Sequence, residues 1–337
     1  MNGFSRSMIA LAAAVAAAFS LSAAGVTAAA AQNLPAVRLA LLQFGTVNWE
    51  ASTIKAEGFD TANGFTLEIV PFASGNATQV ALLSGDVDIS TGDWLYASRQ
   101  RAMGEPLAFV PYSTSMGGLM ARCDAGYSSI ADLKGKTIGV AGGPLDKSWL
   151  MLQGLAEGEH GFDLKAETRQ VFGAPPLLAE KLRQGELDAA LNYWHYNARL
   201  ETEDYCEVVS AQDAAEALGA TGKLSAIGYL FNETWADENP DLAAGFVAAS
   251  AAAKAHLATD DAAWDALRED MKAENDAVFA ALKTHWREGI PAADVAQEEA
   301  DTAAVYLYLA KAGGEDLVGP AKEMAPGTFW HGLKAGN

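Results

Sequence analysis

The stretch Gln79-Val-Ala-Leu-Leu-Ser-Gly-Asp-Val-Asp-Ile-Ser-Thr-Gly-Asp-Trp94 decides the fold. Its first half is a short apolar helical face that stops at Gly85, a residue suited to the left-handed C-terminal cap of a helix. Residues 87–91 then predict a short strand that enters a sheet. The strand ends at Gly92-Asp93-Trp94, a polar and aromatic tip, and in an open α/β sheet such tips face the ligand crevice.

The same order of features returns in Ala179-Glu-Lys-Leu-Arg-Gln-Gly-Glu-Leu-Asp-Ala-Ala-Leu-Asn-Tyr-Trp194. The two segments align without a gap at a glycine, two acids and a tryptophan: Gly85 with Gly185, Asp86 with Glu186, Asp88 with Asp188, and Trp94 with Trp194. Two copies of one unit predict two similar lobes that face a single cleft. Chance recurrence of a common helix–strand unit is the simpler alternative.

This helix, glycine–acid turn and strand resemble the type II periplasmic solute-binding proteins of ABC importers. The resemblance is strongest to the nitrate/sulfonate/taurine (NitT/TauT; NMT1/THI5-like) group, which also includes binding proteins for a thiamine pyrimidine precursor. Asp132-Leu-Lys-Gly-Lys-Thr-Ile-Gly-Val140 is a second pattern common in that fold. The resemblance implies an α/β fold of two lobes, each a mixed sheet flanked by helices. It also implies a small-molecule ligand held by hinge closure, and an inner-membrane permease with its ATPase as partner.

The N-terminus predicts a signal peptide over residues 1–31. Arg6 is followed by an Ala/Leu/Phe/Val run, and Ala29-Ala-Ala31 fits the small-residue rule for cleavage near Ala31. A membrane anchor is the alternative, but the run is alanine-rich and interrupted by serines, and no later segment is expected to span a bilayer. The mature protein is therefore expected in the periplasm.

The composition is strongly acidic, with a formal net charge of −20. Removal of the leader takes away only Arg6, so the mature chain keeps this charge imbalance. Such a field argues against nucleic acid and anionic membranes as partners. We expect a monomer without a cofactor.

The order of the expected strands predicts a discontinuous first lobe, residues 32–117 and 225–337, around a second lobe of residues 118–224. Small residues at 113–118, between two strands, predict the first hinge crossing. The family resemblance implies that the helical C-terminal third packs back on the first lobe. Cys123 and Cys206 flank the second lobe, and export favours a disulfide between them. Two unpaired buried cysteines remain the alternative.

Candidate ligand contacts come from the segments that follow strands, where aromatic faces stand beside hydrogen-bonding groups. They are Phe44, Thr46, Asn48, Trp49, Asp93, Trp94, Ser115, Met116, Lys147, Ser148, Trp149, Phe172, Asn192, Tyr193, Trp194 and His195. Trp94 and Trp194 are expected on opposite walls of the cleft. The alternative for Phe44 and Trp49 is that they pack a helix onto its sheet.

The charged candidates bear on the ligand. In the family, the helix start after Gly142 binds an anion; here Asp146 either faces the cleft or caps the helix, and both interpretations remain open. Lys147 is the only cation near the tips, and no arginine stands there for bidentate anion binding. An apolar, aromatic or amine-bearing ligand is favoured over a simple anion. A metal held by Asp93 and Asp146 stays open, although no spacing motif supports one.

Catalytic motifs are missing from the sequence: there is no nucleophile elbow, no phosphate-binding loop and no paired-histidine metal motif. A solute-binding protein is therefore predicted rather than an enzyme. Two alternatives remain. One is a periplasmic accessory or sensor that acts on a protein partner, and the other is a thiamine-precursor-type enzyme, which would need a reactive histidine such as His195 in the cleft.

Overall fold

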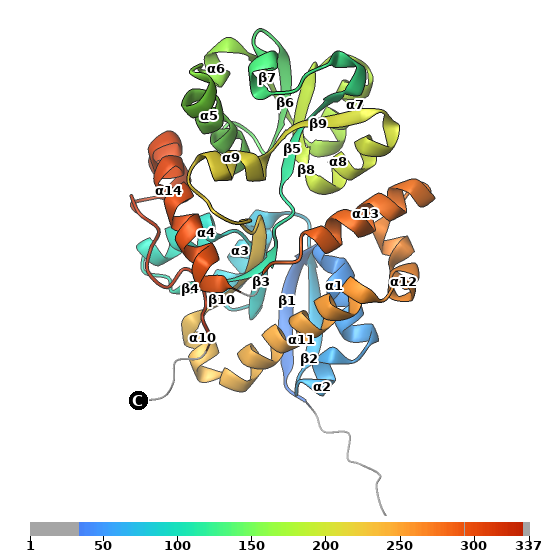
Figure 1. Ribbon diagram of the computed structural model, residues 1–337. Coiled ribbons are helices and arrows are strands. Elements are labelled where there is room, and N and C mark those ends of the chain that lie inside the picture. The colour runs from blue at the N-terminus through green and yellow to red at the C-terminus, as the bar shows by residue number, and fades with distance from the viewer. Residues whose placement is uncertain (1–33, 293, 333–337) are drawn as a thin grey trace, which may run out of the picture. The chain divides into compact units, whose positions relative to one another are not determined.

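The computed structural model describes residues 34–292 and 294–332, so the predicted signal peptide lies outside the described residues. Ten strands form two mixed five-stranded sheets, joined by the chain that crosses between them (Figure 1). The first sheet has the order β2-β1-β3-β10-β4 and the second has the order β7-β6-β8-β5-β9. The strands are β1 Ala36–Leu42, β2 Thr66–Phe72, β3 Ile89–Gly92, β4 Leu107–Ser113, β5 Gly117–Arg122, β6 Thr137–Ala141, β7 Arg169–Gly173, β8 Ala189–Tyr193, β9 Tyr205–Ser210 and β10 Ile227–Asn232.

The two sheets repeat one pairing scheme. Strand β1 is parallel to β2 and β3, and β10 is antiparallel to β3 and β4. In the second sheet β6 is parallel to β7 and β8, and β5 is antiparallel to β8 and β9. The predicted helix–strand repeat therefore supplies equivalent strands, β3 and β8, each in the middle of its sheet.

The glycine–acid turn has the same structural role in both copies. Gly85 and Gly185 have φ values of 78° and 72°, the left-handed region that favours glycine. Asp88 then accepts a hydrogen bond from the backbone N–H of Arg38, and Asp188 accepts one from Thr137 N, both at 2.8 Å. Each acid thus ties the start of the central strand to the neighbouring parallel strand.

Helices cover both sheets and form most of the C-terminal third. They are α1 Val47–Ala56, α2 Phe59–Ala62, α3 Gly75–Ser84, α4 Trp94–Ala102, α5 Lys147–His160, α6 Leu164–Glu167, α7 Pro175–Arg183, α8 Trp194–Leu200, α9 Ala211–Ala217, α10 Glu233–Glu238, α11 Pro240–Thr259, α12 Ala262–Met271, α13 Asp276–Glu288 and α14 Val295–Val318, with short 3-10 turns η1 Cys123–Ala125, η2 Ile130–Leu133 and η3 Glu201–Glu203.

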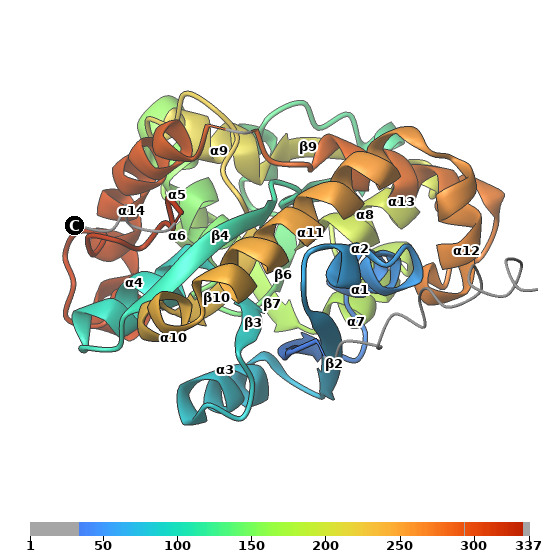
Figure 2. The same cartoon turned by 90° about the horizontal axis from the view of Figure 1, so that it is seen from below.

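The C-terminal helices do not pack on the first lobe alone. Helix α11 lies against α1 and α2, but α13 packs on α8 and α14 packs on both α4 and α5 (Figures 1 and 2). A side chain at Gly154 of α5 would meet the ring of Tyr308 of α14 at 2.8 Å, so the small residue permits this close contact. The implied packing on the first lobe is thus incomplete, because α13 and α14 contact helices beside both sheets.

Helix α11 is an exception to the expectation that no segment after the leader is apolar enough to span a bilayer. By length and composition it is apolar enough to cross a membrane, with a mean hydropathy of 1.2 over its best window. In the structure Phe246, Ala249, Ala253 and Leu257 on this helix are buried. Phe246 packs on Tyr229 of the first sheet, with 4.8 Å between ring centroids. The apolar run therefore serves as a core helix here.

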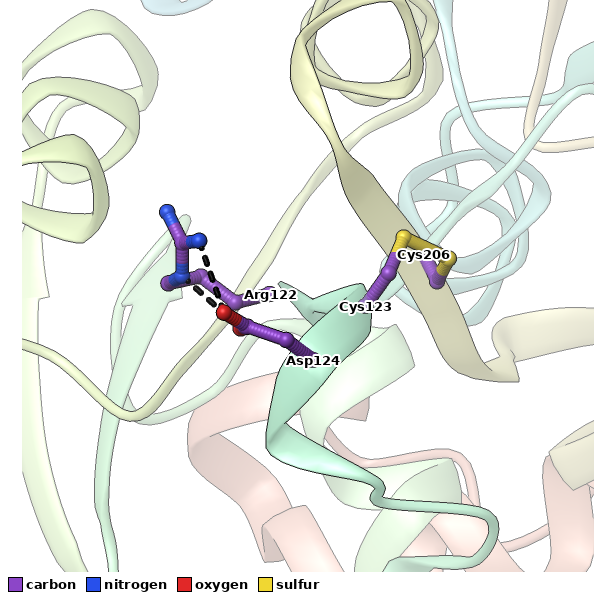
Figure 3. The surroundings of a disulfide bond; sticks show 4 residues. All are labelled: Arg122, Cys123, Asp124 and Cys206. Atoms are coloured by element: carbon purple, nitrogen blue, oxygen red, sulfur yellow. Dashed lines mark hydrogen bonds and ion pairs between the residues drawn. A yellow bond between two sulfur atoms is a disulfide. The ribbon is translucent and has the colours of Figure 1, made fainter.

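The predicted disulfide is present. Cys123 and Cys206 are joined at the outer end of the second sheet, where β5 and β9 are neighbours (Figure 3). Cys123 N also donates to the carbonyl of Asp204, and Arg122 pairs with Asp124 beside the bond. The bridge closes a loop with a sequence separation of 83 residues, and so links the strands that enter and leave the second sheet.

Candidate ligand-binding cleft

A cavity of about 550 Å³, the main cavity, lies between the two sheets. Its walls are the segments that follow β1, β3, β6 and β8, together with the crossing between β4 and β5 and the start of β10. The carboxyl ends of parallel strands place these segments at one edge of each sheet, the usual position of a ligand crevice in open α/β sheets. The following predicted residues line it: Phe44, Thr46, Asn48, Asp93, Ser115, Met116, Lys147, Ser148, Tyr193, Trp194 and His195.

An ion pair crosses the main cavity. Lys147 Nζ, at the start of α5, lies 3.1 Å from Asp93 Oδ2, which precedes α4 on the opposite side. The same ammonium donates to the carbonyl of Ala226, at 2.7 Å, just before β10. The Lys147 side chain is only 14% exposed. Two of its three donors are therefore committed to the protein itself.

Both cavity carboxylates cap helices. Asp93 accepts a hydrogen bond from Tyr96 N at 2.9 Å, and Asp146 accepts one from Trp149 N at 3.1 Å. The second oxygen of Asp146 packs against Gly142, where an added Cβ would lie 2.4 Å from it. Burial raises the pKa of Asp146 above its ordinary value. Of the two interpretations left open for Asp146, the geometry supports the capping one.

Four consecutive ring-bearing residues form the aromatic wall of the cavity: Tyr193, Trp194, His195 and Tyr196. Tyr193 is 43% exposed, and across the cavity Phe44 is 76% exposed. Loss of hydration, with the nearby Arg199 charge, lowers the pKa of His195 to about 4. The imidazole is thus neutral at physiological pH and adds a polar, uncharged edge to this wall.

Trp194 also links the two lobes. Its ring meets that of Trp49 edge to face, with 6.0 Å between centroids, and Trp49 in turn contacts Trp264. Trp49 is buried in this cluster and lines a second, adjoining cavity of about 680 Å³ rather than the main one. The alternative considered for Trp49, packing of its helix onto the sheet, does not describe this cluster either, because its other buried members lie on helices α8, α11, α12 and α13.

Four further candidates do not line the main cavity. Trp94 and Trp149 are fully buried, and Trp94 Nε1 donates to the carbonyl of Ser225 at 3.1 Å. Asn192 is buried and its amide donates to the carbonyl of Pro175. Phe172 is 45% exposed, on an edge strand, and lines neither of the two cavities described above. The expectation that Trp94 faces Trp194 across the cleft is therefore wrong, because Trp94 packs inward beside Tyr306 of α14.

Other lining residues were missed, and three of them had a usable signal. Thr91 stands directly before the tip at Gly92-Asp93, Ser113 opens the predicted crossing, and Tyr196 closes the aromatic run. Gln79 reaches the cavity from α3, one turn after Gly75. Helical spacing predicts that these two residues share a face, but nothing local shows that this face meets the cleft.

The positions of the histidine, cysteine and acidic side chains bear on the metal and enzyme alternatives. Across 34–292 and 294–332, no group of three or more histidine, cysteine or acidic side chains lies close enough to hold a metal ion. In the same ranges no hydrogen bond joins the His195 ring to a carboxylate, so the histidine lacks the partner that would orient a general base.

The family model described as NMT1/THI5-like matches residues 53–263. The chain belongs to the NMT1/THI5-like family. No curated protein sequence matches it. Among solved structures, the NMT1/THI5-like chain is similar to the periplasmic aliphatic sulphonate binding protein SsuA from Escherichia coli, at 16% identity and a TM-score of 0.67, covering 88% of this chain and 97% of that one.

Two further structures show the range of proteins with this fold. The alkanesulfonate-binding protein SsuA from Xanthomonas axonopodis pv. citri, bound to MOPS, is 16% identical with a TM-score of 0.64, over 88% of this chain and 98% of that one. The desulfurization enzyme DSZB is 15% identical with a TM-score of 0.56, over 83% and 92%. At these identities the matches establish the fold alone, and they confirm the predicted two-lobed α/β architecture.

Proposed function

We propose that this protein is the periplasmic substrate-binding component of an ABC importer, which captures a small organic solute between its lobes. The observation that carries the proposal is the main cavity, whose lining comes from both sheets and from the crossing segments between them. Membership of the NMT1/THI5-like family and the fold shared with periplasmic binding proteins support it. A ligand in contact with both lobes stabilises the closed arrangement over the open one by its differential affinity.

The proposed lobes are residues 32–117 with 225–337, and residues 118–224. The change of sheet between β4 and β5, and again between β9 and β10, supports these boundaries. Gly117 is the first residue of β5 in the second sheet, and an added Cβ there would be 1.7 Å from the carbonyl oxygen of Asn192 in β8. Closure would therefore rotate the backbone at 113–116, before this fixed point. The contacts of α13 and α14 with both sets of helices would limit the range of rotation.

The proposed location is the periplasm, after cleavage near Ala31, and the proposed partners are an inner-membrane permease and its ATPase. The disulfide supports export, because such bonds persist in oxidising compartments. We propose that the mature protein is a monomer, because the main cavity is lined by residues of a single chain.

The experiment is native mass spectrometry of protein exported from its own host, followed by gentle denaturation to identify the released molecule. The ligand-free protein is then titrated with that molecule, and closure is followed by small-angle scattering. We expect one small organic molecule per chain and a smaller radius of gyration when it binds. A protein that releases no molecule and keeps its radius with a broad panel of solutes would contradict the proposed function.

A further inference from the structure

The charges that line the main cavity are few and nearly cancel. Asp93 and Asp146 are its acids, and among the described lining residues Lys147 is the only permanent cation. His195 adds no charge at neutral pH, because its pKa lies at about 4. The formal charge of the lining is therefore −1, which favours an uncharged or cationic ligand before any contact is considered.

The single cation has two of its three N–H groups committed to the protein. Lys147 Nζ contacts Asp93 Oδ2 at 3.1 Å and the Ala226 carbonyl at 2.7 Å, and its side chain is largely buried. An anion that accepted the third N–H of this ammonium would lie close to the Asp93 carboxylate, which would repel it. Partly buried pairs are screened little by salt, so this repulsion persists at physiological ionic strength.

Two helix N-termini that could attract an anion are each capped by a carboxylate of the protein. The N-termini of α4 and α5 both reach the cavity, and each carries free N–H groups at its positive dipole end. Asp93 occupies the first through Tyr96 N and Asp146 occupies the second through Trp149 N. At these two helix starts a carboxylate of the protein therefore already occupies the position that an anion would take.

The groups left for a ligand are neutral or aromatic. They include the hydroxyl of Thr91, the amide of Gln79, the imidazole of His195 and the exposed ring of Tyr193. The ring of Phe44 already has Lys272 Nζ at 4.2 Å from its centroid. Aromatic faces attract organic cations as well as apolar rings. Such a lining recognises a ligand by shape and neutral hydrogen bonds, not by ion pairing with an anion.

We infer that Asp93 determines the charge selectivity of the cleft: by holding Lys147 across the cavity, it excludes anionic ligands and restricts the site to uncharged or amine-bearing aromatic solutes. This inference rests on the proposed function and names the class of solute. The contrast is with the structural relatives whose names state that they bind sulfonates.

The test uses three probes that share one ring and differ in charge: benzylamine, benzyl alcohol and benzenesulfonate, titrated at pH 7.5 by ligand-observed NMR. The variant is Asp93→Asn, which keeps an oxygen to accept from Tyr96 N but removes the partner of Lys147. The matched control is Asp163→Asn. Asp163 is an exposed carboxylate that caps α6 in the same way, through Ala166 N, and lies outside the cavities.

In the wild type we expect benzenesulfonate to bind at least tenfold more weakly than the better of the other two probes. Asp93→Asn should raise the affinity for benzenesulfonate at least tenfold, Asp93→Asn/Lys147→Met should remove this gain, and Asp163→Asn should match the wild type. Wild-type protein that prefers benzenesulfonate, or an Asp93→Asn variant that gains no affinity for it, would overturn the inference.

Circular dichroism melting establishes that the variant is folded, and Asp93→Ser, which also retains a capping oxygen, replaces it if it is not. The two proposals fail in different ways. A wild-type protein that closes around a sulfonate keeps the binding function and refutes the selectivity of Asp93. A protein that captures no solute from its host refutes the binding function. The gain of affinity for benzenesulfonate in Asp93→Asn is still measured in that case, and it tests the selectivity separately.

Discussion

Replacing Trp94 with alanine should destabilise the fold and leave the ligand site intact. The side chain is fully buried, its indole N–H donates to the Ser225 carbonyl, and its ring packs 6.4 Å from that of Tyr306. A buried aromatic side chain covers roughly 150–250 Å², and its truncation to alanine costs about 3–5 kcal/mol. With roughly 300 folded residues and about 2.1 cal/mol/K of unfolding entropy per residue, the melting temperature should fall by about 5–8 °C.

The assay is thermal unfolding by circular dichroism, paired with ligand titration well below the melting temperature. Trp194→Ala is the matched variant, since this tryptophan holds the same position in the second copy but is half-buried and lines the main cavity. We expect the Trp194 variant to lose less stability and more ligand affinity. A Trp94→Ala protein that melts within about 2 °C of the wild type would refute the core assignment. So would one that loses as much affinity as Trp194→Ala.

Three further changes have defined outcomes. Replacing Cys123 and Cys206 with serine should lower the free energy of unfolding by about 4–5 kcal/mol in the loop-entropy model, measured by urea denaturation, because the bond closes a loop of 83 residues. Lys254→Met should cost about 3–5 kcal/mol, since it leaves the fully buried Glu50 carboxylate without its partner at 2.6 Å, and the double variant with Glu50→Gln should recover much of that loss. Desolvation raises the folded-state pKa of Glu207 to about 7, so the folded protein binds a proton at this carboxylate more tightly than the unfolded chain does. The stability of the protein should therefore fall as the pH rises from about 4.5 to 7. Melting temperatures of Glu207→Gln, measured over the same pH range, should lack this part of the decrease.

The repeated unit explains why the fold could be predicted from the sequence. A positive-φ glycine, an acid that binds the neighbouring strand and a short central strand are local features, and both copies carry them at equivalent positions. The positions of the strand tips then follow, because parallel strands end at the same edge of a sheet. This local logic placed eleven of the sixteen predicted ligand contacts in the main cavity, including the aromatic run that begins at Tyr193.

The same local logic failed for the two tryptophans. Trp94 and Trp194 each begin the helix after a central strand, so their sequences predict one role for both. Their environments differ because α14 packs on α4, where Tyr306 meets Trp94, whereas α8 faces α13 and Trp49. The C-terminal helices lie far away in sequence and break the symmetry of the repeat. No pattern within either copy carries that information.

The pairing of Asp93 with Lys147 could not be predicted from local sequence either, and this pair bears on how the cleft closes. The sequence placed Asp93 and Lys147 at the cleft but did not show that they pair across it. Because this pair links the lobes without a ligand, the ligand cannot gain closure energy by supplying that charge contact. Its differential affinity must come from the aromatic wall and from neutral hydrogen bonds, where expulsion of water from rings and cavity favours the closed state. Under the proposed mechanism, a site closed in this way would discriminate by shape and hydration, and electrostatics would serve mainly to reject solutes of the wrong charge.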